Sequence, residues 1–149
     1  MYDVLSRALG GKTGRAINGW DIGLTTINLS PSKSLAALQI PSFLTVIECH
    51  RDEVRELPPF AEVLAWSEKT GIEMFKCGDH IMGIQGHPEY TKDILSHLVD
   101  RLLQRNLIQS FLFQNCHVEA AKASLEAYEP DQEAWQRLCK SFLKGNAML

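Results

Sequence analysis

The spacing of apolar residues changes once along the chain, and this change constrains the fold more than any other feature. Between residues 22 and 85, apolar residues alternate with polar ones or form short runs bounded by Gly, Pro, Ser and Asp, which is typical of strands. From residue 94 they follow the i, i+1, i+4, i+5 rhythm of an amphipathic helix. The sequence therefore predicts a strand-rich first half followed by helices, with no internal domain boundary.

The pattern predicts strands over residues 22–29, 43–49 and 62–67, and a hairpin that joins 72–77 to 80–85 through the turn pair Gly78-Asp79. It also predicts one helical turn near residues 35–38.

A short helix is also predicted at the start of the chain, over residues 2–9. Val4, Leu5 and Ala8 share one face of it, and Gly10-Gly11 ends it. Three helices are expected in the second half, at about 94–103 with Thr91 as N-cap, at 109–128, and at 131–144. Trp135, Leu138, Cys139 and Phe142 are expected on one face of the last helix.

The composition suits one globular domain with its own core, since 45% of the 149 residues are apolar and 22% are charged. The net charge is −3 and there is no basic stripe, which argues against a nucleic-acid partner. No apolar run is long enough to cross a membrane, and the first residues do not resemble a secretory signal. We therefore expect a cytosolic (cytoplasmic) protein.

The cysteines show neither a disulfide framework nor a metal motif, so four reduced thiols are expected: Cys49, Cys77, Cys116 and Cys139. Three Cys and His pairs are conceivable as ligands: Cys49 with His50, Cys77 with His80, and Cys116 with His117. Because no CxxC or HxxxH spacing is present, we expect no metal site.

The sharpest local motif is Gly86-His87-Pro88-Glu89, which follows an apolar strand and precedes a helix. Pro88 biases His87 toward extended backbone, where residues i and i+2 point the same way. The carboxylate of Glu89 can then orient one ring nitrogen of His87 and leave the other free as a general base. From spacing alone, a hydrogen-bonded pair without a catalytic role is the simpler interpretation, because a triad needs a third member.

With this motif the chain resembles the class I glutamine amidotransferases, and in particular the plant γ-glutamyl peptidases. Further segments that carry the resemblance are Arg7-Ala8-Leu9-Gly10-Gly11-Lys12, Cys49-His50-Arg51-Asp52-Glu53-Val54 with Leu57-Pro58, Gly78-Asp79-His80, and Trp135-Gln136-Arg137-Leu138-Cys139-Lys140. The resemblance implies an α/β chain with an incomplete flavodoxin-like fold. Residues 1–149 would form a partial glutamine amidotransferase type-1 domain with a C-terminal helical extension.

The resemblance also implies roles for three residues. His87 would activate a cysteine thiol, and Glu89 would orient His87. His50 is a weaker candidate for substrate binding or loop support; equally, it would belong to a solvated cluster with its charged neighbours Arg51, Asp52 and Glu53.

The family nucleophile stands in a Gly-x-Cys-x-Gly elbow, which would fall just upstream of the helix at residues 2–9. None of the four cysteines has flanking glycines in that pattern. Without a thiol no γ-glutamyl thioester can form, so we expect the chain to be inactive alone. We also expect an unpaired apolar sheet edge, because inner parallel strands of the family fold would be missing.

The function implied by the resemblance is hydrolysis of a γ-glutamyl amide in glutathione or its conjugates, which feeds glucosinolate synthesis, with a small-molecule substrate and no cofactor. Glutamine hydrolysis with transfer of ammonia to a synthase is the sibling possibility, and no synthase domain follows. The alternative is a catalytically inactive form that acts as a binding or interaction module.

Overall fold

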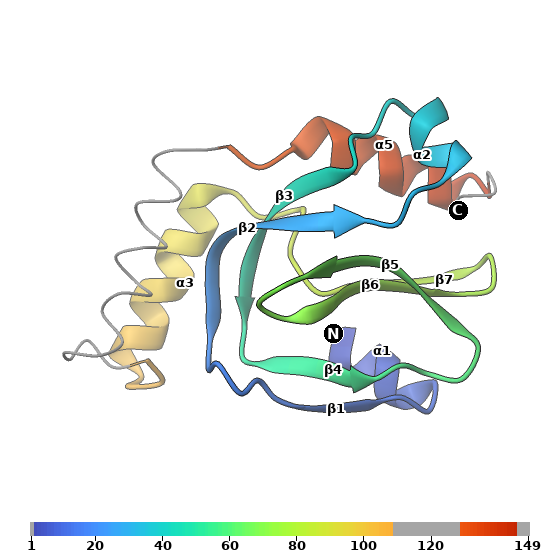
Figure 1. The fold of residues 1–149 in the computed structure, drawn as a ribbon. Coiled ribbons are helices and arrows are strands. Elements are labelled where there is room, and N and C mark those ends of the chain that lie inside the picture. Colours follow the sequence, from blue (N-terminus) through green and yellow to red (C-terminus); the bar gives the residue numbers. More distant parts are fainter. Residues whose placement is uncertain (1, 109–128, 146–149) are drawn as a thin grey trace.

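A five-stranded antiparallel sheet forms the centre of the molecule (Figure 1). The computed structural model describes residues 2–108 and 129–145. The sheet order is β3-β2-β5-β6-β7. The bounds are β2 (Asp21–Leu29), β3 (Phe43–His50), β5 (Ala61–Ser67), β6 (Gly71–Cys77) and β7 (Ile81–Ile84). These strands confirm the predicted strands and the hairpin, with boundaries that move by one residue at most ends. All pairings between the described strands are antiparallel, so the parallel strands of the family fold do not occur among them.

The sheet is strongly curled, as the contact between the segment that follows β7 and the edge strand β3 shows. The backbone N–H of His87 donates to the carbonyl oxygen of Ile47 at 2.8 Å, and the two residues form an antiparallel bridge. β3 and β7 are at opposite ends of the strand order. The curl therefore places residues 85–87 beside the end of β3.

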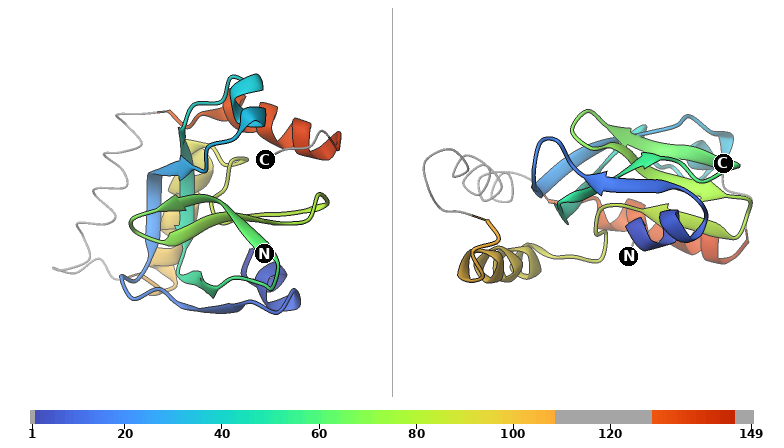
Figure 2. Two further views of the ribbon diagram at one scale, coloured as in Figure 1. Left: turned by 45° about the vertical axis from the view of Figure 1, so that its right-hand side comes forward. Right: turned by 90° about the horizontal axis from the view of Figure 1, so that it is seen from below.

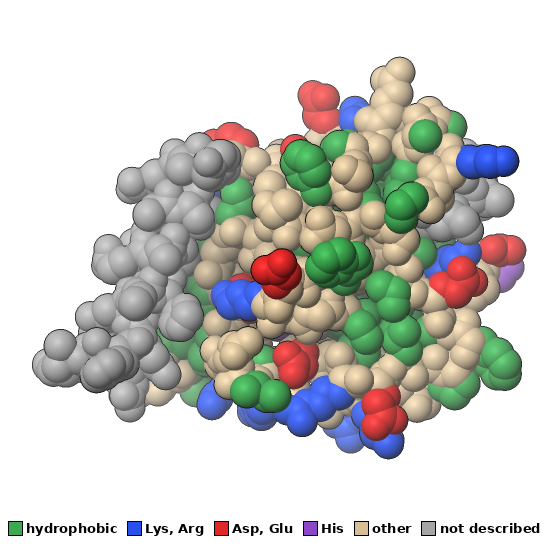
Figure 3. All heavy atoms as spheres, viewed as in Figure 1, with side chains coloured by type: hydrophobic (Ala, Val, Ile, Leu, Met, Phe, Trp, Pro, Cys, Tyr) green, Lys and Arg blue, Asp and Glu red, His purple; other side chains and the backbone are tan. Residues whose placement is uncertain are grey.

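Two further strands, which the pattern did not predict, form a separate antiparallel pair: β1 (Lys12–Arg15) and β4 (Asp52–Glu56). Exposed ion pairs join them, from Lys12 to Glu56 at 2.8 Å and from Arg15 to Asp52 at 3.1 Å. Basic and acidic side chains accordingly gather along this lower edge of the molecule (Figure 3). The charged run was hard to recognise as a strand because only Val54 is buried.

Helix α1 (Tyr2–Ala8) packs on the sheet with a different face from the predicted one. Val4 is 69% exposed and Ala8 is exposed, whereas Tyr2 and Ser6 are buried. The tyrosine decides the orientation: its ring packs against Phe75 with 5.3 Å between centroids, and its hydroxyl donates to a backbone carbonyl of β6. Burial of a whole aromatic ring outweighs burial of a valine.

The helices of the second half begin where the sequence indicates. Helix α3 (Lys92–Gln104) has Thr91 as its N-cap, and the threonine hydroxyl accepts from Ile94 N–H at 3.3 Å. Helix α5 (Gln132–Leu143) buries Trp135 and Leu138 in the core, which confirms the predicted face. The helix predicted at 109–128 lies outside the described residues, and the helical turn near 35–38 appears as α2 (Lys33–Ala37). Figure 2 shows α1, α3 and α5 on one side of the strands.

The edge of β3 is partly covered rather than bare. Thr45 N–H and hydroxyl donate to Oδ2 of Asp131 at 2.7 and 2.9 Å, and the Trp135 indole N–H donates to the Thr45 carbonyl at 2.8 Å. Together with the bridge from Ile47 to His87, these contacts differ from the expected unpaired edge. Of the described helices, none is long and apolar enough to cross a membrane.

Candidate active site

His87 and Glu89 form the pair that the spacing predicts. Nδ1 of His87 lies 2.8 Å from Oε1 of Glu89, and the His87 ring stacks on Tyr90 with 4.0 Å between centroids. An ionised carboxylate only accepts, so this contact places the hydrogen of the neutral ring on Nδ1. Nε2 then presents a lone pair and has no hydrogen-bond partner among the described residues.

The histidine lines a cavity of about 810 Å³ between the sheet and two helices. Tyr2 and Asp3 of α1 form one part of the wall, and Trp135 and Cys139 of α5 form another. The volume falls in the range of small-molecule sites. The start of α1 thus lies at the same cavity as the His–Glu pair.

Two thiols, Cys49 and Cys139, also line this cavity. Burial, with a smaller effect of the Glu48 carboxyl, raises the pKa of Cys49 to about 11. Burial likewise raises the pKa of Cys139, with a smaller effect of Glu89. A catalytic cysteine needs a lowered pKa, so both thiols are poor nucleophiles near neutral pH.

His50 lies at the end of β3 and is 9% exposed, so it does not belong to a solvated charge cluster. His50 is also one of the residues that line the cavity. Nδ1 lies 3.0 Å from the Asp52 carbonyl, and Nε2 lies 3.2 Å from Oε2 of Glu48, although the second contact lacks the alignment of a hydrogen bond. Since both ring nitrogens face protein groups, this geometry favours the loop-support role over substrate contact.

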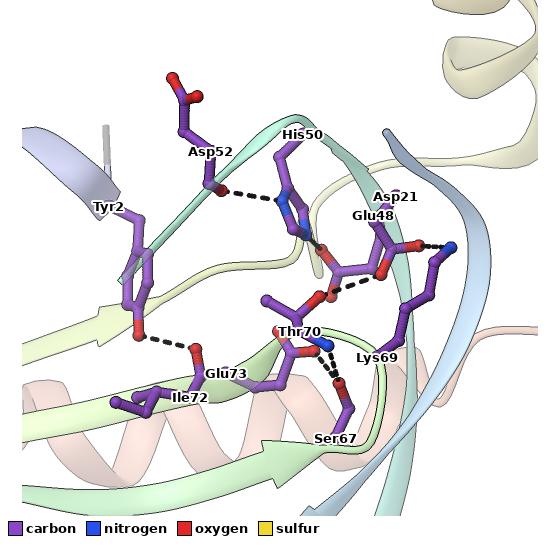
Figure 4. A network of polar contacts seen from close by, with 10 residues as sticks. All are labelled: Tyr2, Asp21, Glu48, His50, Asp52, Ser67, Lys69, Thr70, Ile72 and Glu73. Carbon is purple, nitrogen blue, oxygen red and sulfur yellow. Dashed lines mark hydrogen bonds and ion pairs between the residues drawn. The ribbon is translucent and has the colours of Figure 1, made fainter. Parts of the chain in front are cut away.

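A buried acidic cluster adjoins His50 and was not predicted (Figure 4). Glu48 and Glu73 are 0% and 1% exposed, and burial is the main cause that raises the pKa of Glu48 well above its ordinary value and that of Glu73 to about 8. Asp21 nearby pairs with Lys69 at 2.5 Å. The available signal was a glutamate inside each of two strand segments that are rich in apolar residues.

Comparison with known proteins shows which family this sequence matches. The sequence model of glutamine amidotransferase class-I matches residues 2–126. Gamma-glutamyl peptidase 5 of Arabidopsis thaliana is 44% identical over 98% of this chain and 58% of its own length. Gamma-glutamyl peptidase 3 of the same plant is 42% identical over 97% and 58%. The chain thus spans less than two thirds of these relatives.

Among solved structures, a glutamine amidotransferase from Thermotoga maritima has a similar fold. The TM-score is 0.69 at 22% identity, and the match covers 99% of this chain and 60% of that one. At this identity the likeness concerns the fold alone. The matches confirm the expected family resemblance and fold class.

Proposed function

Because the chain belongs to the class I glutamine amidotransferase family, we propose that it carries the His–Glu part of a site that hydrolyses γ-glutamyl amides. The observation on which this rests is the contact between His87 Nδ1 and Glu89 at the wall of an 810 Å³ cavity. That contact leaves Nε2 as the nitrogen that takes and returns a proton.

The proposed reaction needs a cysteine nucleophile, and none of the four cysteines in the sequence has the flanking glycines of such a group. A Gly-x-Cys-x-Gly elbow preceding α1 would supply it, since Tyr2 and Asp3 line the same cavity as His87. The N–H that follows a nucleophile in such an elbow commonly contributes to the oxyanion hole. The 149 residues alone are therefore proposed to be inactive.

In the proposed sequence of steps, Nε2 of His87 removes the thiol proton and the sulfur attacks the γ-carbonyl carbon. The protonated imidazole then gives its proton to the leaving nitrogen as the C–N bond breaks, which leaves a γ-glutamyl thioester. A water molecule deprotonated by His87 attacks this thioester, and glutamate and the free thiol are released. Glu89 keeps the ring in the required tautomer throughout.

Glutathione or a glutathione conjugate is the proposed substrate, hydrolysed in the cytosol and upstream of sulfur compounds such as glucosinolates. The preference for a peptidase rests on the extent of the matches. The relatives named gamma-glutamyl peptidase cover 97–99% of the chain, whereas a glutamine-hydrolysing GMP synthase from Methanococcus vannielii covers 60% at 35% identity.

A chimera tests the proposal. The chain is fused behind the part of gamma-glutamyl peptidase 5 that the match does not cover, and release of glutamate from glutathione and from an S-conjugate is measured. We expect turnover by the chimera and none by the chain alone. His87→Ala should lower the rate about 10²–10⁴-fold. The matched control His97→Ala, an exposed histidine of α3, should leave the rate unchanged.

Two outcomes would contradict the proposal: a folded chimera without turnover, or turnover by the chain alone that survives His87→Ala. The first outcome, with saturable binding of the γ-glutamyl compound, would support the alternative of a binding module.

A further inference from the structure

Three ligand-type side chains from two strands converge beside the candidate active site. Glu48 and His50 lie on β3, and Glu73 lies on β6. One ligand atom from each lies within 4.8 Å of the other two, and all three residues are buried. Figure 4 shows both carboxyl groups and the imidazole directed toward one another.

The atoms that face one another are hydrogen-bond acceptors. The backbone carbonyl of Asp52 can only accept, so the hydrogen of the neutral His50 ring belongs on Nδ1, which leaves Nε2 as a lone pair. That lone pair lies 3.2 Å from Oε2 of Glu48. Neither of these atoms, nor Oε2 of Glu73, has a hydrogen-bond donor among the described residues. Buried acceptors in this arrangement need either a shared proton or a cation between them.

We propose that Glu48, His50 and Glu73 bind one divalent transition-metal cation, with zinc as the expected ion. The groups around the ligands resemble the outer shell of a metal site. The second ring nitrogen of a metal-binding histidine usually donates to a carbonyl, as Nδ1 of His50 does. The Ser67 hydroxyl donates to Oε1 of Glu73 at 2.5 Å, which holds Oε2 toward the cluster.

The charges around the cluster also favour a cation. Asp21 adds a third buried carboxyl group close to the cluster, and its Oδ2 and Oδ1 accept from Thr70 at 3.1 Å and from Lys69 at 2.5 Å. The ammonium group of Lys69 is paired with Asp21 rather than with Glu48 or Glu73 among the described contacts. Two positive charges between Glu48 and Glu73 would offset both buried carboxylates.

Only a small movement separates the present geometry from coordination. Ligands about 2.0–2.1 Å from tetrahedral zinc lie roughly 3.3 Å from each other. His50 Nε2 and Glu48 Oε2 are already at that spacing. Because the three ligand atoms lie within 4.8 Å of one another, Glu73 would have to approach by at most roughly 1.5 Å. Rotation about the last side-chain torsion of glutamate, which is broadly distributed, allows this movement. Two carboxylates and one imidazole suit zinc better than calcium or magnesium, which prefer oxygen ligands alone.

Binding would cross-link strands that are not neighbours, since β2 and β5 lie between β3 and β6 in the sheet. The cluster contains neither His87 nor Glu89, so this proposal stands or fails separately from the proposed hydrolysis. The expected effect is on stability.

The test uses the full 149-residue chain, stripped with a chelator and titrated with Co²⁺ and Zn²⁺. We expect saturable binding of one Co²⁺ per chain, seen as visible d–d absorption that Zn²⁺ displaces. At a zinc concentration 100 times the dissociation constant, the melting temperature should rise by about 5–10 °C. Glu73→Gln keeps the shape and the Ser67 contact but removes a ligand, so it should weaken Co²⁺ binding by about 10-fold or more.

Two variants are matched controls. His97 is exposed and its Nδ1 also faces a backbone carbonyl, that of Asp93 at 2.7 Å, but it forms no ion pair with a carboxylate among the described residues. Glu62 is an exposed glutamate of β5 that pairs with Lys76. His97→Ala and Glu62→Gln should bind Co²⁺ like the unmodified chain. The proposal is overturned if the unmodified chain shows no saturable binding, or if Glu73→Gln binds equally well. In either case a shared proton holds the cluster together.

Discussion

The carboxylate of Glu89 lies 2.8 Å from Nδ1 of His87, two residues away along the chain, while the backbone N–H of His87 is bonded to Ile47 on β3. The orienting contact is thus local, but the position of the histidine depends on the curled sheet. A proline between the two residues and a glycine before them allow both contacts at once.

The first prediction concerns this contact. Glu89→Gln should abolish the preference for hydrogen on Nδ1, because an amide can present either a donor or an acceptor. Long-range ¹H–¹⁵N spectra of the neutral ring should show hydrogen on Nδ1 in the unmodified chain and a mixture in the variant. In the active chimera, kcat should fall about 10²–10⁴-fold with little change in KM. Equal spectra would show that Glu89 does not set the tautomer.

The second prediction concerns the attachment of α5 to the sheet. Asp131→Ala removes the acceptor of both Thr45 donors and should lower the free energy of unfolding by about 1–3 kcal/mol. Glu133→Ala, two residues on, removes an exposed side chain with a 3.9 Å partner and should change it by less than about 0.5 kcal/mol. Urea unfolding followed by tryptophan fluorescence measures both. If the two variants behave alike, the contacts to Thr45 do not stabilise the fold.

The third prediction concerns the glycine before the histidine. A Cβ at Gly86 would lie 2.8 Å from a methyl carbon of Val46 and would also meet Oε1 of Glu48. Both neighbours are buried, so Gly86→Ala should cost about 1–3 kcal/mol through overpacking. Because the clash also pushes residues 85–87 away from β3, protection of the His87 amide in hydrogen exchange should fall. An unchanged exchange rate would contradict this.

The fourth prediction uses the raised pKa of Cys49, which is about 11. A raised thiol pKa means less thiolate at a given pH. Because the thiolate is the reactive form, the rate of alkylation should be lower. At pH 8 roughly 10⁻³ of Cys49 is thiolate, against roughly a quarter of a free thiol of ordinary pKa. Mass-spectrometric rates with iodoacetamide, site by site, should therefore be at least 10-fold below that of N-acetylcysteine and should rise steeply between pH 9 and 11. A rapid reaction at pH 7 would make Cys49 a candidate nucleophile after all.

Local chemistry was enough to predict some features. Thr91 caps α3 as expected because an N-cap contact spans only three residues. The contact between His87 and Glu89 also spans only two residues. Residues 43–49 and 72–77 were recognisable as strands because each is a short run rich in apolar residues. The face of α5 was likewise readable from the positions of Trp135 and Leu138.

Other features depended on partners far along the chain. The prediction that Val4 lies on the packed face of α1 was wrong, because the ring of Tyr2 packs against Phe75 of β6 and leaves Val4 exposed. The strand pair of β1 and β4 was missed, because its stability depends on pairing across the chain rather than on apolar alternation. Spacing motifs also gave no sign that Glu48, His50 and Glu73 would meet, since a metal-type cluster built from two strands has no fixed spacing.

The order of strands and helices and the His–Glu pair follow from the amino-acid sequence alone, because each depends on periodicity or on residues within a few positions of one another. The family and its class of fold also follow from the sequence, through a resemblance carried by motifs along most of the chain. The folded chain was needed to show that the pair faces a cavity shared with α1 and α5, that His50 contacts the buried Glu48, and that burial raises the pKa of two cavity thiols. The reason is physical: burial and long-range approach set electrostatics, and both arise only when the curled sheet brings β3, β6 and residues 85–87 together.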